Sequence, residues 1–310
     1  MSKLVVIGSS NTDMIIQVPR LPGPGETILG GTFDTAAGGK GANQAVAAAR
    51  AGCKVSFIAA VGDDMFGEKA LKGFEQEGIY IGLCVIDANE PSGVAQIFVD
   101  GSGENCIGVA PGANSCLEPG HIDRAAGLFG EGVYLLLQLE TPLDTVAYAA
   151  RLGKEKGCTV ILNPAPAAEL PDDLLQNIDY LTPNTNEAGL LTGISVTDDT
   201  SAGKAAAVLH KRGCRNVIIT RGGQGVFVSQ LHDRDRHSTG TSSAYEVEAL
   251  DTTAAGDVFN GCLAARMVAG DSLESAINYA QAAAALSVQV LGAQDSAPTH
   301  DAVQRFLQPL

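Results

Sequence analysis

Short apolar segments that alternate with helical segments constrain the fold of this chain most strongly. Leu4–Ile7 is an apolar run that ends at Gly8, as expected of a strand buried on both faces of a sheet. An alanine-rich helix is expected next, over 41–51, followed by a strand over 54–60, and the alternation resumes between 133 and 219. Helices close the C-terminal third, over 255–269, 273–290 and 301–307. This order predicts an α/β fold with a mostly parallel central sheet and helices on both faces.

Two regions, 11–37 and 83–107, interrupt the alternation with β-forming and turn residues that show no helical periodicity. We expect them to pair into a small separate sheet that emerges from the edge of the main sheet as a lid. Its apolar face and open edges also suit a dimer interface, so a homodimer formed through the lid is expected. The remaining segments, 1–10, 38–82 and 108–310, are expected to form the α/β domain that binds nucleotide and substrate.

Composition narrows the classes of partner and compartment. The net charge of −15 argues against a nucleic-acid or membrane partner because no basic stripe compensates it, but bound Mg²⁺ and local N–H groups can still hold a nucleotide. The seven cysteines form no C-x-x-C pair, which fits reduced thiols in the cytosol and argues against zinc. The first strand begins too soon for a signal peptide, so a cytoplasmic protein is expected.

Several common nucleotide motifs are absent from the sequence. Residues 38–41 read Gly-Gly-Lys-Gly, but they lack the upstream glycine and the hydroxyl residue of a P-loop. No G-x-G-x-x-G run occurs, which weakens a nicotinamide-dependent oxidoreductase. No H-R-D or D-F-G motif occurs, which excludes a protein kinase. A nucleotide must therefore bind to another scaffold.

Residues 251–257, Asp-Thr-Thr-Ala-Ala-Gly-Asp, carry the strongest chemical signal. Small residues lead into the start of a helix, where unpaired N–H groups and the positive dipole end can hold a developing anion. Asp257 lies in the first turn and could act as the base for a hydroxyl. An aspartate in a first helical turn is also favourable without any function, so the motif alone leaves both interpretations open.

Candidate sugar ligands lie near the ends of strands. Asn11 and Asp13 follow the first strand and suit vicinal hydroxyls, through one donor–acceptor group and one acceptor. Lys40 and Asn43 add donors beside a Gly-Gly pair. Taken alone, this segment is better explained as a flexible start of a helix with a solvated lysine, but the upstream Asn11 and Asp13 favour a function. Glu140 follows a later strand, and could be either a ligand contact or part of an ordinary helix start.

Two further segments are candidates for nucleotide binding. Asn184 with Glu187 is a capping-box pattern that needs no function, although both residues could also order water around Mg²⁺. Residues 220–225, Thr-Arg-Gly-Gly-Gln-Gly, could cradle phosphates with a hydroxyl, a guanidinium and a flexible backbone. A simple turn between two strands explains the second segment at least as well.

Taken in order along the chain, these motifs resemble the ribokinase (PfkB) family of sugar kinases, and the match covers nearly the whole sequence. The matching segments are Asn11-Thr12-Asp13, residues 38–45 (Gly-Gly-Lys-Gly-Ala-Asn-Gln-Ala), Gln138-Leu139-Glu140, Asn163-Pro164-Ala165-Pro166, Thr182-Pro183-Asn184 with Glu187, residues 251–257 and Gly292-Ala293.

The resemblance implies ATP-dependent phosphorylation of D-ribose at its 5-hydroxyl. Asp257 would be the base, and the N–H groups of Ala254, Ala255, Gly256 and Asp257 would form the anion hole. The implied sugar ligands are Asn11, Asp13, Gly38, Gly39, Lys40, Asn43 and Glu140, together with Asp257. The alternatives left open are a sibling kinase for another sugar or nucleoside (deoxyribose, fructose or adenosine-like), a non-catalytic sugar-binding regulator and, least favoured, an oxidoreductase.

The resemblance also implies ligands for ATP, Mg²⁺ and a monovalent cation, K⁺. The nucleotide residues would be Asn184, Thr220, Arg221, Gly222, Gly223, Gly225, Gly256 and Gln281, with Glu187 supporting Mg²⁺ through water. The K⁺ ligands would be Asp251, Thr253, Ser287, Val290, Gly292 and Ser296, largely through carbonyl oxygens. Gln281 departs from the family, which usually has His or Asn beside the purine. The Val290-Leu291 segment is more apolar than expected.

Overall fold

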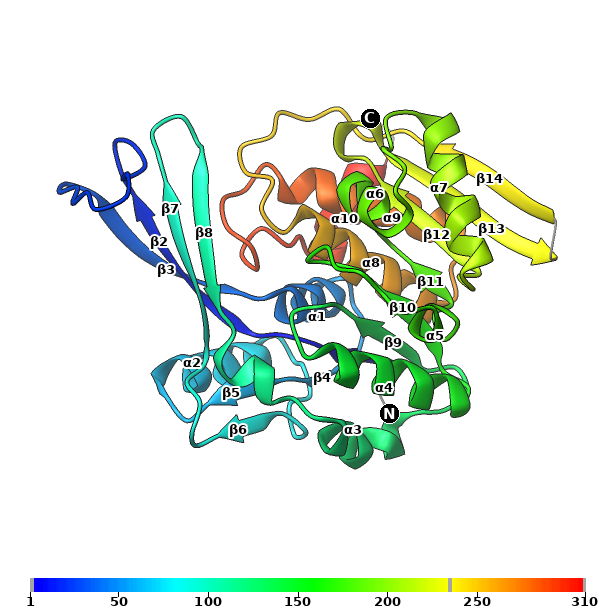
Figure 1. The fold of residues 1–310 in the computed structure, drawn as a ribbon, viewed down its shortest axis with the longest axis horizontal. Coiled ribbons are helices and arrows are strands. Elements are labelled where there is room, and N and C mark those ends of the chain that lie inside the picture. The colour runs from blue at the N-terminus through cyan, green and yellow to red at the C-terminus, as the bar shows by residue number, and fades with distance from the viewer. Residues whose placement is uncertain (1–2, 234–235, 309–310) are drawn as a thin grey trace.

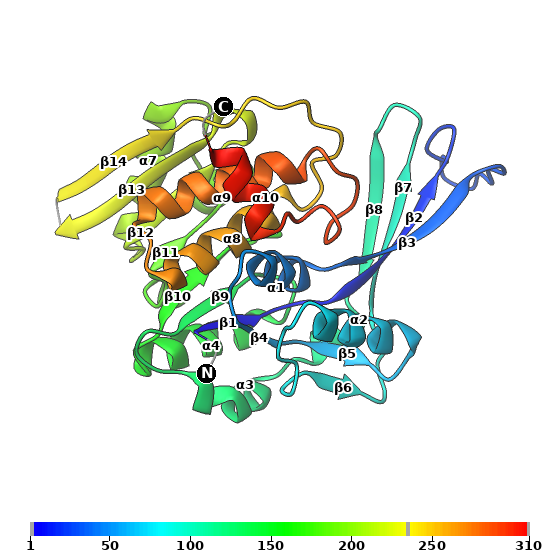
Figure 2. The ribbon, with the colours of Figure 1, turned by 180° about the vertical axis from the view of Figure 1, so that it is seen from behind.

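The computed structural model describes residues 3–233 and 236–308 (Figures 1 and 2). Its centre is an eight-stranded sheet in the order β14-β13-β12-β11-β10-β9-β1-β4. The parallel strands are β1 (Leu4–Ile7), β4 (Val55–Ile58), β9 (Tyr134–Leu137), β10 (Thr159–Leu162), β11 (Tyr180–Leu181) and β12 (Asn216–Thr220). An antiparallel hairpin of β13 (Val226–Asp233) and β14 (Arg236–Ser242) extends one edge.

Helices cover both faces of this sheet, as the alternating pattern predicts (Figures 1 and 2). One face is covered by α1 (Lys40–Arg50), α8 (Ala255–Ala269), α9 (Leu273–Ser287) and α10 (His300–Leu307). The other is covered by α3 (Pro119–Ala125), α4 (Leu143–Glu155), α5 (Asp172–Leu175), α6 (Thr185–Thr192) and α7 (Asp199–Lys211). Within the described ranges, none of these helices combines the length and the apolar character needed to cross a membrane.

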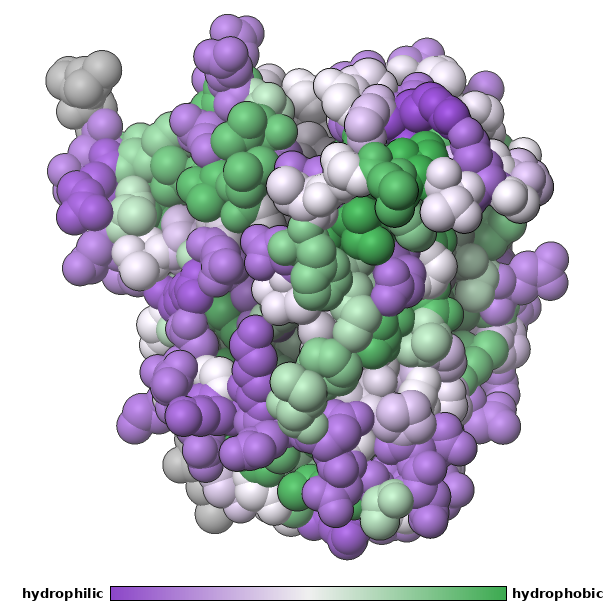
Figure 3. Space-filling view, turned by 90° about the vertical axis from the view of Figure 1, so that its left-hand side faces the viewer, coloured by the Kyte–Doolittle hydropathy of each residue, from purple (hydrophilic) through white to green (hydrophobic). Residues whose placement is uncertain are grey.

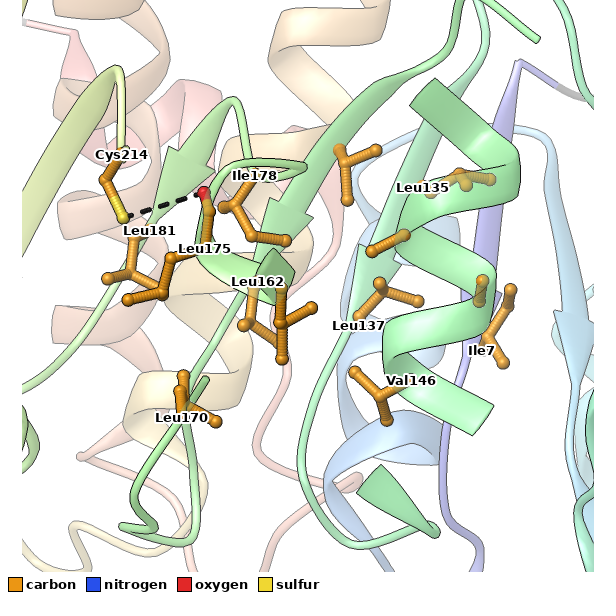
Figure 4. Packing of buried hydrophobic residues seen from close by; sticks show 14 of the residues in the cluster. Ile7, Leu135, Leu137, Val146, Leu162, Leu170, Leu175, Ile178, Leu181 and Cys214 are labelled. Carbon is orange, nitrogen blue, oxygen red and sulfur yellow. Dashed lines mark hydrogen bonds between the residues drawn. The ribbon is translucent and has the colours of Figure 1, made fainter. Parts of the chain in front are cut away.

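The side chains of alternate residues in the buried strands pack into two separate hydrophobic cores, one on each face of the sheet. Val5 and Ile7 face the core under α4, whereas Leu4 and Val6 face the core under α1 and α8. Figure 4 shows the first of these cores, in which the strand residues Leu135 and Leu137 lie against the helices. Every strand of the parallel part is thus buried on both sides, and its carboxyl end is the edge where a site can open.

The four-stranded second sheet projects from the side of the molecule, at the left in Figure 1. Its order is β3 (Thr32–Gly38), β2 (Asn11–Gln17), β7 (Gly93–Val99) and β8 (Asn105–Ala110). The expected small sheet is therefore present, but β8 runs beyond residue 107. The short β6 (Val85–Asp87), which lies within the second expected lid segment, pairs instead with β5 (Ala60–Gly62).

Helices α1 and α8 approach each other closely at Gly261. A Cβ atom on Gly261 would lie 2.4 Å from the carbonyl oxygen of Gln44 and 2.9 Å from the Cβ of Ala47, so no larger residue fits without moving a helix. Asp257 is one helical turn before Gly261 and therefore lies on the same side of α8. This contact brings the side chains of Asn43 and Gln44 within reach of Asp257.

We predict that Gly261→Ala destabilises the protein by about 1–3 kcal/mol, the usual cost of overpacking a close helix contact. The matched control is Gly73→Ala in α2 (Met65–Gln76), where a Cβ meets no atom within 4 Å. The control is expected to be neutral or to gain up to about 1 kcal/mol of helix propensity. Urea unfolding measures both variants, and equal free energies of unfolding would contradict the packing argument.

Candidate active site

The backbone turns sharply where α8 begins. Ala254 is the only non-glycine residue in the described ranges with a left-handed backbone, at φ 57°. The N–H of Ala255 donates to the carbonyl of Thr252 at 3.3 Å. The N–H groups of Ala254, Gly256 and Asp257 donate to nothing in the described part of the chain. Three free amides at a helix N-terminus form a site suited to an anion.

The carboxylate of Asp257 is buried beside this turn, with 6% of the residue exposed. Its Oδ2 accepts a hydrogen bond from the Asn43 side chain at 3.0 Å, and its Oδ1 accepts one from Gln44 at 2.9 Å. Burial raises the pKa of Asp257, and the charge of Lys40 and the two amide donors only partly oppose that rise. A carboxylate with a raised pKa is a stronger base than an ordinary aspartate.

Asp257 lies close enough to three charged residues, Asp13, Lys40 and Glu140, for their charges to interact. Glu140 accepts hydrogen bonds from the Ser9 hydroxyl at 2.6 Å and from the Lys40 N–H at 2.9 Å. Burial, followed by the charges of Glu140 and Asp257, raises the pKa of Asp13 to about 6. Burial alone lowers the pKa of the Lys40 amine, but the charges of neighbouring carboxylates outweigh it and raise that pKa overall.

The remaining sugar candidates lie at the junction of β2, β3 and α1. A Cβ on Gly38 would lie 2.3 Å from Oδ1 of Asp13, so the carboxylate needs glycine at that position. Gly39 has φ 90° and approaches the backbone N of Asn11 to 2.7 Å, again measured from an added Cβ. Oδ1 of Asn43 is buried without a partner among the described residues, which leaves it free to accept from a ligand.

The candidate nucleotide segments meet at the ends of β11 and β12, where Asn184 pairs with Thr220. Asn184 and Glu187 form the full capping box, with both Glu187 oxygens accepting from Asn184. Burial raises the pKa of Glu187; the hydrogen bond from the Asn184 N–H and the charge of Lys40 oppose that rise, and the charge of Asp257 adds to it. Both interpretations of the motif, structural and functional, are therefore compatible with its position.

Arg221 and Gln281 have protein partners. The Arg221 guanidinium pairs with Asp199 at the start of α7 at 2.5 Å, so it lies against protein while its Nε lacks a partner within the described chain. Gly222 and Gly225 have positive φ angles and close the turn around η3 (Gly222–Gln224), with Gly223 between them. Gln281 donates to the carbonyl of Ser243 at 2.9 Å, and its Oε1 is buried without a partner in the described residues.

Asp251 joins two of the segments expected to hold K⁺. Its carboxylate accepts from the N–H of Thr253 and of Gly292, both at 2.9 Å. Burial alone would raise the pKa of Asp251, but hydrogen bonds from the Thr253 hydroxyl and from these two N–H groups outweigh it and lower the pKa. The N–H of Val290 donates to the Ser287 carbonyl at 3.0 Å. The Ser296 side chain is buried and bonds only locally, to the carbonyl of Ala293 at 2.8 Å. Direct hydrogen bonds thus bring Asp251, Thr253 and Gly292 together, and the Ser296 hydroxyl bonds within its own loop.

Sequence reasoning missed several residues that shape the site. Gln44 belongs to the glycine-rich motif but was given no role, although it holds Asp257. Ser9 bonds Glu140. Asn114, in η1 (Gly112–Cys116), donates to Oδ1 of Asn11 at 2.8 Å and fixes that side chain. No sequence motif predicts the role of Asn114, because Asn114 lies 103 positions from Asn11 along the chain.

A buried carboxylate beside free amides at the start of a helix is an arrangement suited to a phosphotransferase that acts on an alcohol. The family model for pfkB family carbohydrate kinases matches residues 1–300. The chain is 46% identical to a ribokinase from Haemophilus influenzae, over 98% of both sequences, and 38% identical to a deoxyribokinase from Salmonella typhi, also over 98% of both. The structure of Arabidopsis thaliana ribokinase complexed with ribose and ATP aligns with a TM-score of 0.91 at 32% identity, covering 100% of this chain and 99% of that one. This chain belongs to the pfkB family of carbohydrate kinases.

We predict that Asp13→Asn stabilises the protein at pH 8. An acid whose pKa rises from 3.8 to about 6 on folding costs at most about 3 kcal/mol once the pH exceeds both values. That cost is absent below pH 3.8 and grows as the pH rises through 6. Urea unfolding should show the variant more stable at pH 8 and the difference shrinking towards pH 4. A variant no more stable than the parent at pH 8 would contradict the burial of a charge.

Proposed function

We propose that this carbohydrate kinase transfers the terminal phosphoryl group of ATP to the 5-hydroxyl of D-ribose. The observation that carries the proposal is the buried Asp257 carboxylate beside the free N–H groups of Ala254, Gly256 and Asp257. Ribokinases among the relatives, at full length, support ribose as the acceptor. The Arabidopsis complex with ribose and ATP supports the pairing of sugar and nucleotide.

In this proposal Asp257 orients the sugar hydroxyl and accepts its proton as the oxygen attacks the γ-phosphorus. A new P–O bond forms while the bond to the β-phosphate oxygen breaks, and ADP leaves. The free N–H groups of Ala254, Gly256 and Asp257, which together with the Asp257 carboxylate form the catalytic corner, hold the negative charge on the transferred group. Their dipoles are already fixed, so they act without reorganisation. Asn11, Asp13 and Glu140 accept hydrogen bonds from the other hydroxyls, and the Lys40 amine donates one.

We predict that Asp257→Asn lowers kcat by about 10²-fold or more, because an amide cannot accept the hydroxyl proton. Nucleotide binding, measured by calorimetry with ADP, should persist. Because burial raises the pKa of Asp257, the neutral variant should unfold at the same or a higher urea concentration than the parent. Activity within a few-fold of the parent would remove Asp257 from the role of base.

Turnover of a sugar panel tests the substrate. ATP consumption with ribose, 2-deoxyribose, fructose and adenosine, each assayed in K⁺ and in Na⁺, should be fastest with ribose and faster in K⁺. Equal or faster turnover of deoxyribose would favour a sibling kinase, in line with the deoxyribokinase relative. Sugar binding without ATP consumption would favour a non-catalytic regulator.

Two metal ions belong to the proposal. Oxygen donors suit both K⁺ and Mg²⁺. The described residues hold no group of three or more His, Cys, Asp or Glu that could bind a metal ion by themselves, so carbonyl oxygens, water and the phosphates would have to complete both sites. The Asp251 carboxylate and nearby carbonyl oxygens would hold K⁺ and keep the loop at Gly292 next to the corner. Glu187 would support Mg²⁺ through water because both of its oxygens already accept from Asn184. Bound Mg²⁺ would supply positive charge against the phosphates.

The nucleotide would lie along the turn at 220–225, with Asn184 and Gly256 towards the phosphates. The buried, unpartnered Oε1 of Gln281 offers an acceptor where the family usually places His or Asn beside the purine. The pairing of Arg221 with Asp199 indicates that the backbone of this turn, rather than the guanidinium, would contact phosphate.

Free cysteines throughout the described chain support a cytoplasmic location.

The small sheet would act as a lid over the sugar and as the surface of a homodimer. Phe33, Ile107 and Val109 are more than half exposed, and all of β8 is exposed. Figure 3 views the molecule from the side of this sheet and shows apolar surface among polar residues in its upper half. A long exposed edge strand with apolar side chains is rarely left uncovered in solution.

A further inference from the structure

Three buried polar residues occupy the same position on neighbouring strands. Gln138, Asn163 and Thr182 each follow immediately after the carboxyl end of β9, β10 and β11. Gln138 is 0% exposed, Thr182 1% and Asn163 6%, although helices and apolar strands surround them. Burying a polar group costs free energy unless the group is hydrogen-bonded, so we expect each of these three side chains to have a partner.

Their first partner is Gln44 of α1, which is itself fully buried. Gln138 donates to Oε1 of Gln44 at 2.6 Å, and this bond fixes which way the Gln44 amide faces. The Nε2 of Gln44 then donates both to Oδ1 of Asn163 at 3.0 Å and to Oδ1 of Asp257 at 2.9 Å. One side of the Asp257 carboxylate is thus tied to the ends of β9 and β10.

The series of hydrogen bonds continues from Asn163 and returns to the backbone of Asp257. Asn163 donates to the carbonyl of Thr182 at 3.1 Å, and the Thr182 hydroxyl donates to Oδ1 of Asn260 at 2.6 Å. Asn260 donates in turn to the carbonyl of Gly256 at 2.8 Å. That carbonyl belongs to the same peptide unit as the N–H of Asp257, one of the free amides of the corner.

We propose that this closed series of hydrogen bonds positions the catalytic corner. The buried polar ring comprises Gln44, Asn163, Thr182, Asn260 and the Gly256–Asp257 peptide unit, with Gln138 setting its direction. It holds the Asp257 carboxylate from one side and the peptide carrying the Asp257 N–H from the other. The proposal rests on the function proposed above and adds positioning residues that touch neither sugar nor nucleotide.

The geometry favours positioning over a purely structural role. A hydrogen bond to the Gly256 carbonyl polarises the peptide and makes its N–H a better donor, as in other hydrogen-bond chains. The Asp257 carboxylate and the Asp257 N–H are then fixed relative to each other by hydrogen bonds that connect α1, α8 and the ends of β10 and β11. Misplacement by about 1 Å can cost about 10²-fold in rate, so this relative placement is where such a ring acts.

Thr182→Val tests the ring because it removes one hydroxyl, keeps the side-chain shape and lies away from the reacting groups. We expect kcat to fall about tenfold or more, with the KM for the sugar and for ATP changed by no more than about threefold. Thr182→Ser restores the hydroxyl and should recover kcat to within about threefold of the parent. The matched control is Thr145→Val, because Thr145 is equally buried and donates to the carbonyl of Leu117 at 2.6 Å, outside the ring.

A kcat for Thr182→Val equal to that of Thr145→Val would overturn the proposal, as would a serine variant no better than the valine one. Should Thr182→Val fail to fold, Gln138→Met replaces it, because it removes the donor that orients the Gln44 amide. Its kcat is then compared with that of the parent and of Thr145→Val in the same way. The parent rate on the sugar panel tests the proposed function, whereas the ratio of variant to parent tests the ring. If the parent consumes no ATP with any sugar, amide hydrogen exchange decides: Thr182→Val but not Thr145→Val should speed exchange of the Val258 N–H, which donates to the carbonyl of Ala254 at 2.8 Å.

Discussion

The close contact between α1 and α8 is the constraint on which the site depends. Each helix begins at the carboxyl edge of the sheet, and Gly261 lets the two come close enough for side chains of α1 to bond a carboxylate in the first turn of α8. A buried carboxylate is costly, and Asn43 and Gln44 offset part of that cost with donors. The Asp257 carboxylate therefore keeps both of these donors only while the two helices stay in this register.

Charge around the corner explains how an acidic chain can serve a phosphotransferase. Asp13, Glu140, Glu187 and Asp257 influence one another or Lys40, so this group of side chains is negative around a single lysine. Such an environment suits the hydroxyls of a neutral sugar, which donate to carboxylates. It does not suit a polyphosphate, so the free amides at the start of α8 and a bound cation would be needed to hold the phosphates.

The fold was predictable to the extent that its signals are local. The four apolar residues of β1 and the alanines of α1 define their elements by themselves, and polar residues just after strands identify the edge where Asp13, Glu140 and Asp257 meet. The rest is non-local. Asn114 reaches Asn11 across 103 positions, and the pairing of Arg221 with Asp199 depends on where α7 packs. Neither follows from spacing or composition.

The small sheet and the candidate sugar ligands share the same backbone. β2 begins buried at Asn11 and ends exposed at Gln17, while β3 runs antiparallel to it from the exposed end back to Gly38. The ladder pairs Asn11 with Gly38 and Asp13 with Ala36, so Asp13 and Gly38 lie on strands of the projecting sheet, whereas Asp257 lies on α8 of the main domain. A change in the tilt of the small sheet would therefore change the distance between Asp13 and Asp257.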